Sequence, residues 1–223
     1  MPIPTVCLFD LNGTLLDLSV LDPHFSRIFG DPGVRAVWFR QTLELALTQT
    51  AIGTYHSFDK LADAALDMTA ARLSVSVSAA DKKQILSGLS ALPAYSDVPE
   101  ALRLLQNAGC RLAALTNSAP PAADAQVAHA RLSPYFERVL SADTVRLLKP
   151  GPRPYAYAAE TLGVPPAEIC LFAAHSWDIA GALAAGLRAA FIQRPDQALS
   201  PLGPQPEIVG TDLPDAARQI LAK

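Results

Sequence analysis

The sequence is poor in cysteine, in runs of one charge and in long apolar stretches, and each scarcity excludes a class of protein. Its 223 residues include three cysteines, an odd number without a C-x-x-C pair, which argues against a disulfide framework and a thiolate metal site. The 18 basic and 21 acidic residues are well mixed, so binding to nucleic acid or to an anionic membrane surface is not expected. No apolar stretch approaches the ~20 residues that span a bilayer. We therefore expect a soluble, cytoplasmic chain with buried thiols.

What the chain contains is an alternation of apolar runs and helical segments. Apolar residues make up 50 % of the sequence and charged residues 17 %, a balance typical of a folded domain. The first run, residues 6–9, has no basic start and ends at Asp10, so it predicts a strand rather than a signal peptide. Further strands are expected at 111–116, 139–141, 169–173 and 189–193, and helices at 98–109, 122–131, 153–162, 179–185 and 214–222.

A long helical block separates the first strand from the second. Residues 18–93 are rich in Ala, Leu, Gln and Glu at helical spacing and have no strand-like alternation. Elsewhere strands alternate with helices, which predicts an α/β fold with a Rossmann-like parallel sheet covered on both faces. We therefore predict a core domain of residues 1–17 and 94–223 and an inserted helical cap domain of residues 18–93.

Polar side chains follow each strand that leads toward the expected site. Ligands of an open parallel sheet bind beyond the carboxyl ends of its strands. The residues at those ends are Asp10, Asn12 and Thr14, then Thr116, Asn117 and Ser118, then Lys149, and finally His175, Ser176 and Asp178. Polar strand ends are common singly, but this convergence predicts one functional site.

The acidic and basic members of this set suggest nucleophilic catalysis. Asp10 can act as a turn residue, yet no helix follows it directly, and a carboxylate facing a lysine is a plausible nucleophile. Lys149 would keep Asp10 ionised and orient it. Asp178 can cap a helix that starts at residue 179, and it can equally anchor Lys149 or bind a metal.

The remaining polar groups fit substrate binding. Hydroxyl and amide groups at Thr116, Asn117 and Ser118 precede a helix and can hold an anion there. His175 has no partner at zinc-ligand spacing, so we interpret it as a general base or as a lining residue.

Four segments resemble, in order and spacing, the motifs of the haloacid dehalogenase (HAD) superfamily over nearly the whole chain. Residues 9–17 (FDLNGTLLD) resemble its first motif, residues 115–118 its second, Lys149 with Pro150 its third, and residues 171–181 its fourth. Within the superfamily the chain is most similar to the type II (S)-2-haloacid dehalogenases. The residues that carry this closer similarity are Tyr155, Trp177, Asp178, Gly181 and Ala182.

The resemblance implies a HAD-like fold and a hydrolase that acts through an aspartyl ester. Asp10 would attack C2 of a short (S)-2-haloacid and expel halide with inversion, after which water would release a 2-hydroxyacid. The supporting residues would be Thr14, Thr116, Asn117, Lys149, Tyr155 and Asp178. No cofactor or metal is expected, because the attack is on carbon and the leaving group is an anion. The expected partner is a halogenated carboxylate, and the resemblance also allows a homodimer.

Three parts of the sequence depart from the type II pattern. Asn12 stands where the dehalogenases usually carry an aromatic residue. Superfamily phosphatases carry there an aspartate that protonates the leaving alcohol, and an amide cannot do so. The dehalogenases place a substrate-binding arginine directly after a tryptophan, but here Phe39 follows Trp38 and Arg40 comes one residue later, a rotation of about 100° on a helix. Motif four has Ala173 and His175 instead of serine and asparagine. A substrate-lining role is therefore predicted for Phe39, Arg40 and Trp177, and a role in activating water for His175.

Two alternatives remain open at the level of sequence. One is a Mg-dependent phosphatase weakened by Asn12, in which Asp10 and Asp178 would be the hard oxygen ligands of the metal. The other is a non-catalytic binding protein descended from a hydrolase, which the retention of Asp10, Lys149 and Asp178 disfavours.

Overall fold

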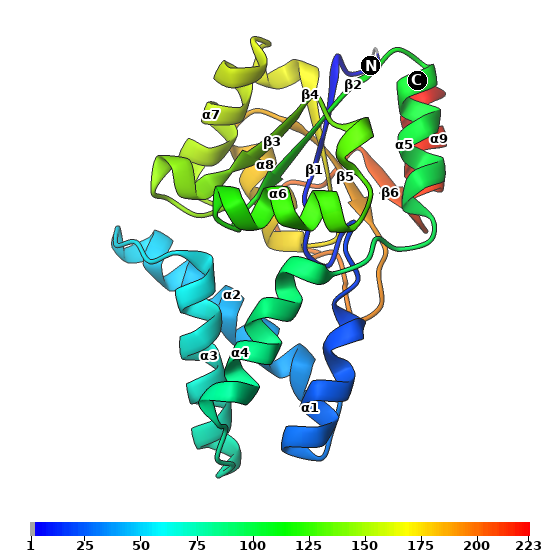
Figure 1. The fold of residues 1–223 in the computed structure, drawn as a ribbon. Coiled ribbons are helices and arrows are strands. Elements are labelled where there is room, and N and C mark those ends of the chain that lie inside the picture. The colour runs from blue at the N-terminus through cyan, green and yellow to red at the C-terminus, as the bar shows by residue number, and fades with distance from the viewer. Residues whose placement is uncertain (1–2) are drawn as a thin grey trace.

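The computed structural model describes residues 3–223 and shows a six-stranded parallel sheet with the order β3-β2-β1-β4-β5-β6 (Figure 1). Its strands are β1 (Val6–Phe9), β2 (Arg111–Thr116), β3 (Arg138–Ser141), β4 (Ile169–Ala173), β5 (Arg188–Ile192) and β6 (Ile208–Gly210). After β1 the chain builds β2 and β3 on one side of it and then crosses back to β4 on the other. The strand order therefore reverses between β1 and β4, which is where doubly wound sheets bind ligands.

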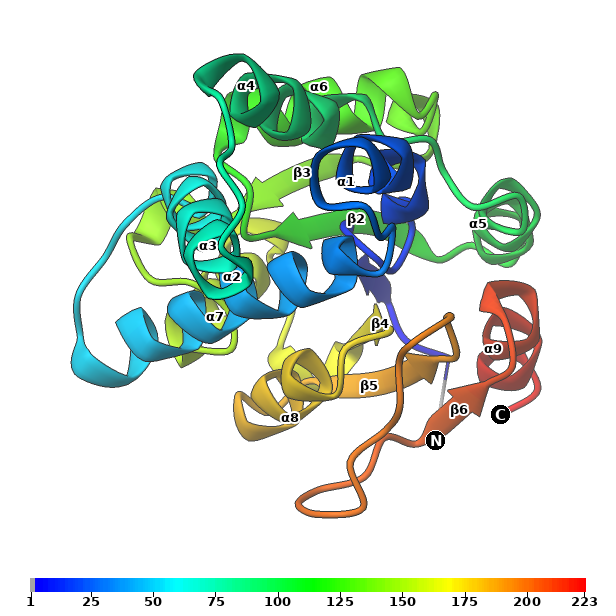
Figure 2. The ribbon, with the colours of Figure 1, turned by 90° about the horizontal axis from the view of Figure 1, so that it is seen from below.

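Helices cover both faces of the sheet, as the alternation along the chain predicts (Figure 2). One face packs against α5 (Val98–Asn107), α6 (Pro120–His129) and α9 (Leu213–Leu221), and the other against α7 (Pro152–Leu162) and α8 (Ser176–Ala184). Successive residues of β1 point to opposite faces, with Cys7 and Phe9 in the first core and Val6 and Leu8 in the second.

The helical block lies beyond the carboxyl ends of the strands, where Asp10 is found (Figure 1). It consists of α1 (Asp22–Phe29), α2 (Val34–Ile52), α3 (Phe58–Leu73) and α4 (Ala79–Gly88).

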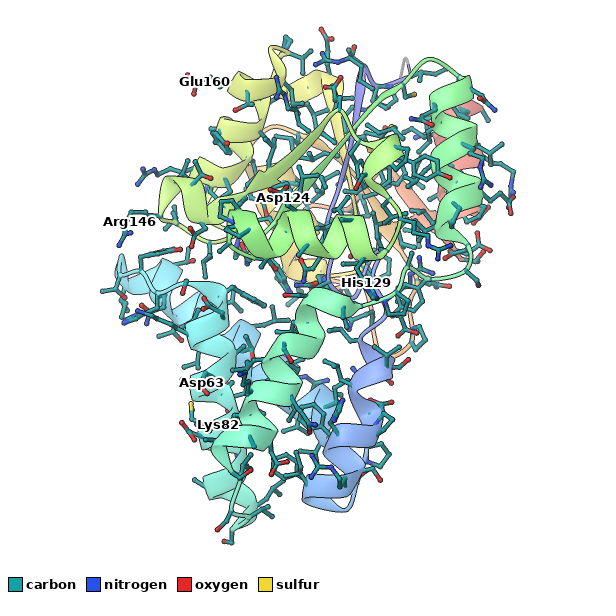
Figure 3. The ribbon with its side chains drawn as sticks, viewed as in Figure 1. Asp63, Lys82, Asp124, His129, Arg146 and Glu160 are labelled. Carbon is teal, nitrogen blue, oxygen red and sulfur yellow. The ribbon has the colours of Figure 1, made fainter. Side chains whose placement is uncertain are left out.

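Trp38 of α2 holds this block together. Its ring lies 5.2 Å from that of Phe25 on α1, and its indole nitrogen donates to the Ala62 carbonyl of α3 at 2.8 Å. On the outside of the block, Lys82 of α4 pairs with Asp63 of α3 at 3.3 Å and also with Asp67 (Figure 3). An aromatic centre and surface ion pairs thus fix the helices that cover the site.

Most of the predicted elements are confirmed, and their differences from the prediction have local causes. Helix α6 begins two residues early because Pro120 and Pro121 occupy its first turn, where proline is well tolerated. Helix α8 begins at Ser176 with His175 as the N-cap residue, so of the roles left open for Asp178 the structure shows the contact with Lys149 and not the helix cap. The three-residue strand β6 was not predicted.

The structure also bears on the cysteines and on membrane insertion. Cys7, Cys110 and Cys170 are buried free thiols, as predicted. Within residues 3–223 the structure shows no helix whose length and apolar character would let it cross a bilayer.

Candidate active site

Asp10 occupies the reversal point of the sheet, at the carboxyl end of β1. Its main-chain nitrogen donates to the Phe172 carbonyl of β4 at 3.1 Å, so the residue sits directly between the two central strands. Its side chain is buried, yet one edge of it lines a small chamber under the helical block. A buried carboxylate must be paired or hydrogen bonded, and the surrounding loops supply those partners.

Lys149 bridges the two carboxylates of the site. Its fully buried Nζ lies 2.9 Å from Oδ1 of Asp10, 2.6 Å from Oδ2 of Asp178 and 2.8 Å from the Leu115 carbonyl. The loop that carries Lys149 is fixed by Asn117, whose Oδ1 accepts from the Lys149 main-chain nitrogen at 2.8 Å and whose Nδ2 donates to its carbonyl at 3.3 Å. Hydrogen bonds therefore fix both the main chain of Lys149 and the ammonium group at the end of its side chain.

The two carboxylates have opposite protonation preferences. Burial alone would raise the pKa of Asp10, but the charge of Lys149 and the hydrogen bonds from His175 and Thr14 hold it well below its ordinary value. Burial raises the pKa of Asp178; Lys149 opposes this shift, and the negative charge of Asp10 adds to it. Asp10 is therefore the more readily ionised of the two groups, and an ionised carboxylate is what nucleophilic attack requires.

Thr14 connects Asp10 to motif four. Its hydroxyl donates to Oδ2 of Asp10 at 2.7 Å and accepts from the main-chain nitrogen of Ala174 at 3.0 Å. On the other carboxylate, the Tyr155 hydroxyl donates to Oδ1 of Asp178 at 2.6 Å. Burial and the Asp178 charge raise the pKa of Tyr155, so the phenol remains a neutral donor.

Asn12 is held by neutral partners. Its Nδ2 donates to the Ser118 hydroxyl at 3.2 Å, and its Oδ1 accepts from Nε2 of Gln126 at 2.9 Å. The residue that replaces the phosphatase acid is therefore a fixed amide in the wall of the chamber.

Two adjoining cavities lie between the helical block and the strand ends. The inner chamber encloses about 10 Å³ and is lined by Asp10, Asn12, Phe39, Leu43, Phe58, Thr116, Asn117, His175 and Trp177. The outer cavity is about 470 Å³ and shares four of these residues, Phe39, Leu43, His175 and Trp177. The inner chamber has room for about one water molecule at most, so the helical block fits closely over Asp10.

The structure brings most of the predicted site residues together and places three elsewhere. Arg40 is exposed and lines the outer cavity, because the helical rotation turns it away from the inner chamber and brings Phe39 there instead. Tyr155 contacts Asp178 rather than the chamber wall. Ser118 accepts from Asn12 and lines a separate surface pocket.

Several site residues escaped prediction from the sequence. Leu43 and Phe58 line the inner chamber, but an apolar residue on a helix gives no signal that separates a cavity wall from core packing. Gln126 reaches Asn12 from 114 positions away. Arg194 donates to the Thr14 carbonyl at 2.9 Å and stacks over Tyr95, and nothing in the sequence marks it.

Hydrogen-bond donors of the chain itself surround the two carboxylates. Each of their four oxygens already accepts a hydrogen bond, from Lys149, Thr14, His175 or Tyr155. The positive charge between the two carboxylates is that of the Lys149 ammonium. Among residues 3–223, His, Cys, Asp and Glu side chains form no cluster of three or more that is suited to a metal.

Comparison of the chain with known proteins agrees with this geometry. The (S)-2-haloacid dehalogenase of Pseudomonas sp. (strain YL) is 30 % identical over 207 residues, which cover 92 % of this chain and 89 % of the relative. The L-2-haloacid dehalogenase of Xanthobacter autotrophicus, solved with chloropropionic acid covalently bound, superposes with a TM-score of 0.89 at 25 % identity over 97 % of this chain and 98 % of that one. A second solved L-2-haloacid dehalogenase superposes with a TM-score of 0.93 at 28 % identity over 99 % of both chains.

The family match covers every side chain that contacts Asp10 or Asp178 in the site described above. Residues 4–186 match the family model of the haloacid dehalogenase-like hydrolases, a span that begins before Asp10 and ends after Asp178. Asp10, Lys149 and Asp178 all lie within the matched span. This chain belongs to the haloacid dehalogenase-like hydrolase family.

Proposed function

We propose that the protein hydrolyses the carbon–halogen bond of a short (S)-2-haloacid through an ester on Asp10. One observation carries the proposal: Asp10 is held ionised by Lys149 beside Asn12, an amide that cannot protonate a leaving group. Such a site suits a leaving group that departs as a stable anion. The named relatives, and the chloropropionic acid covalently bound in one of them, support the same reaction.

In the first step a carboxylate oxygen of Asp10 attacks C2 from the side opposite the halogen. The C2–halogen bond breaks, halide leaves with the bonding electrons, and the configuration at C2 inverts. Thr14 and Lys149 keep the carboxylate oriented by hydrogen bonds of 2.7 and 2.9 Å. Holding the reacting groups in this geometry is the main contribution of the chain to this step.

In the second step water attacks the carbonyl carbon of the Asp10 ester. The bond between that carbon and the ester oxygen breaks, so the ester oxygen leaves with the product as the hydroxyl group of an (R)-2-hydroxyacid. Lys149 lies 2.9 Å from Oδ1 of Asp10. With Oδ1 as the carbonyl oxygen of the ester, Lys149 can stabilise the negative charge that develops on Oδ1 when water attacks.

The inner chamber also offers donors for an anionic substrate. The indole nitrogen of Trp177 is buried, and none of the residues that the structure describes pairs with it. The Thr116 hydroxyl accepts from the Ser118 main-chain nitrogen at 3.2 Å and keeps its own proton for another acceptor. We assign these two groups to the halide or the carboxylate of the substrate, in place of the cap arginine that Phe39 replaces.

The test is halide release from (S)-2-chloropropionate, measured by ion chromatography in the presence of EDTA. The wild type should release chloride and form (R)-lactate in equal amounts, and Asp10→Asn should release neither while keeping its circular dichroism spectrum. Chloride release by Asp10→Asn would overturn the assignment of the nucleophile. Phosphate release from an aryl phosphate with Mg²⁺, without halide release, would favour the phosphatase alternative instead.

We further propose that residues 18–93 act as a cap over a core of residues 1–17 and 94–223. The close fit over Asp10 requires that this cap opens for substrate to enter, because the inner chamber is smaller than any haloacid. A cytoplasmic location, work without a cofactor, and a homodimer are predictions that follow from the buried thiols and from the family.

A further inference from the structure

Two chain segments join the helical block to the sheet, and Arg194 lies beside both of them. The chain leaves the sheet through residues 14–17 and returns to it through residues 93–97 (Figure 1). The main-chain nitrogen of Tyr95 donates to the Leu15 carbonyl at 2.9 Å, so the two segments are paired. We call this pair of segments the hinge, because it forms the covalent connection between the helical block and the sheet.

The guanidinium group of Arg194 contacts both segments of the hinge. Its Nε donates to the Thr14 carbonyl at 2.9 Å, and its Nη1 lies 2.9 Å from Oδ2 of Asp97. Its Cζ lies 4.1 Å from the centroid of the Tyr95 ring. A guanidinium group is planar and donates in fixed directions, so it sets the positions of these three partners relative to one another. The side chain of Arg194 is only 7 % exposed, so water screens these contacts little.

The partners of Arg194 connect it to the nucleophile and to the rest of the core. The residue whose carbonyl Arg194 binds, Thr14, donates its hydroxyl to Oδ2 of Asp10 at 2.7 Å. On the other side, Oδ2 of Asp97 also accepts from the main-chain nitrogen of Leu213 at the start of α9, at 3.0 Å. A continuous series of contacts therefore runs from α9 through Arg194 to the side chain that orients Asp10.

The hinge has to change conformation in every turnover. The inner chamber encloses about 10 Å³, so the helical block must move away from Asp10 before a haloacid can enter. Arg194 belongs to the sheet, since it comes two residues after the end of β5 at Ile192, and it contacts the hinge from there. Its hydrogen bonds are thus available to return the hinge to one arrangement when the block closes.

We propose that Arg194 is a positioning residue that holds the hinge and the main chain of Thr14 in the arrangement needed for attack by Asp10. Its effect on catalysis rests on the proposed function. Arg194 does not contact the chamber in which the reaction takes place, so it acts through Thr14 on the orientation of the Asp10 carboxylate. Without it, the Thr14 hydroxyl and the closed helical block would no longer be held in register with Asp10, and the first step would slow.

The experiment compares Arg194→Met and Arg194→Lys with a matched control, Arg188→Met. Methionine can still pack on Tyr95 but donates no hydrogen bond, whereas lysine keeps the charge without the planar, two-directional donor set. Arg188 is at the start of β5, at the opposite edge of the sheet from the hinge. It pairs with Glu207 at 2.7 Å, and its side chain is 10 % exposed, so its loss removes a similarly buried ion pair.

The first readout is the burst, the first release of chloride from (S)-2-chloropropionate in a rapid-mixing assay. Arg194→Met should slow the burst by about 10²-fold, which is the usual effect of misplacing a reacting group by about 1 Å. Arg194→Lys should give an intermediate rate. Arg188→Met should keep the burst rate of the wild type, although it too should lower the midpoint of urea denaturation.

The second readout is hydrogen exchange of the hinge, measured by mass spectrometry without substrate. The amide hydrogens of Asp17 and Tyr95 are donors in the pairing of the two segments. Peptides that contain them should exchange faster in Arg194→Met than in the wild type, while the peptide that contains β4 should exchange at the same rate in both. A residue that only adds to overall stability would not change the exchange of the hinge selectively, so Arg188→Met should leave it unchanged.

The outcomes separate this inference from the proposed function. A burst as fast in Arg194→Met as in Arg188→Met would overturn the positioning role and leave the dehalogenase intact. A slower burst without faster exchange of the hinge would also overturn it, because Arg194 would then act by another route. If Arg194→Met does not fold, the same two comparisons on Arg194→Lys decide. Absence of any burst in the wild type would instead refute the proposed function, and the exchange experiment would still test whether Arg194 holds the hinge.

Discussion

Replacing Lys149 by methionine should unfold the protein more readily and inactivate it, because Lys149 is the only cation placed between the two buried carboxylates in the part of the chain that is described. The ammonium is fully buried and lies within 2.9 Å of oxygens of both Asp10 and Asp178. Removing one partner of a buried ion pair costs about 3–5 kcal/mol, against a total stability of about 5–15 kcal/mol. For a chain of this size that corresponds to a fall in Tm of about 6–20 °C.

The way in which the stability loss of Lys149→Met depends on pH identifies its cause. In the wild type the depressed pKa of Asp10 stabilises the folded state at pH values above 3.8, the ordinary pKa of this group. This stabilisation is lost as the pH falls through the lower pKa that Asp10 has in the folded state. Without Lys149, burial would raise the pKa of both carboxylates, so the variant regains stability as the pH falls and they become protonated. The deficit should therefore be largest near pH 7–8 and smaller near pH 4–5.

The measurement is urea denaturation of Lys149→Met and the wild type at several pH values, together with halide release. Lys82→Met is the control, since Lys82 pairs with Asp63 on the surface of the helical block (Figure 3) and such exposed pairs contribute about 0–1 kcal/mol. A loss of less than 1 kcal/mol at pH 7 for Lys149→Met, or a deficit that does not vary with pH, would refute the reasoning.

Three further substitutions test the contacts around the nucleophile. Thr14→Val removes the 2.7 Å hydrogen bond to Asp10, so it should lower the free energy of unfolding by about 1–3 kcal/mol and slow the first release of chloride. Thr14→Ser keeps the hydroxyl and should keep the stability and the rate of the wild type. Equal rates of first chloride release for the two variants would contradict this. Tyr155→Phe removes the donor to Asp178 and should lower the urea midpoint by an amount equal to about 1–3 kcal/mol, with a smaller effect on the burst than Thr14→Val has. Phe39→Ala should lower the free energy of unfolding by about 3–5 kcal/mol and join the two cavities. The ratio of kcat/KM for 2-chlorobutanoate to kcat/KM for chloroacetate should therefore rise. An unchanged ratio would show that Phe39 does not limit the size of the inner chamber.

The sequence predicts the sheet well because its longer strands consist almost entirely of apolar residues. Strands β2 and β4 have the predicted bounds, since each is an uninterrupted apolar run that ends at polar residues. Parallel strands deliver their carboxyl ends to one edge, so Asp10, Lys149 and Asp178 could be placed together before the structure was known. β6 was missed because three residues after a proline-rich loop carry no periodic signal.

Contacts between distant segments could not be predicted. The pairing of Asn12 with Gln126 joins residues 114 positions apart, and a glutamine in an alanine-rich helix does not reveal its partner. The helical rotation of Arg40 was predicted, but that Phe39 would then close the chamber depends on how the helical block packs. The free Nε2 of His175 likewise depends on three-dimensional surroundings rather than on motif spacing.

The most direct test of the Asp10 ester is a single turnover in H₂¹⁸O with enzyme in excess over (S)-2-chloropropionate. If water attacks the ester carbonyl, the lactate from the first turnover contains only ¹⁶O, and mass spectrometry finds ¹⁸O in the peptide that contains Asp10. With substrate in excess, the label should then appear in the product of later turnovers. If ¹⁸O appears in the lactate of the first turnover and not in Asp10, water attacks C2 directly, and the covalent role given to Asp10 is contradicted.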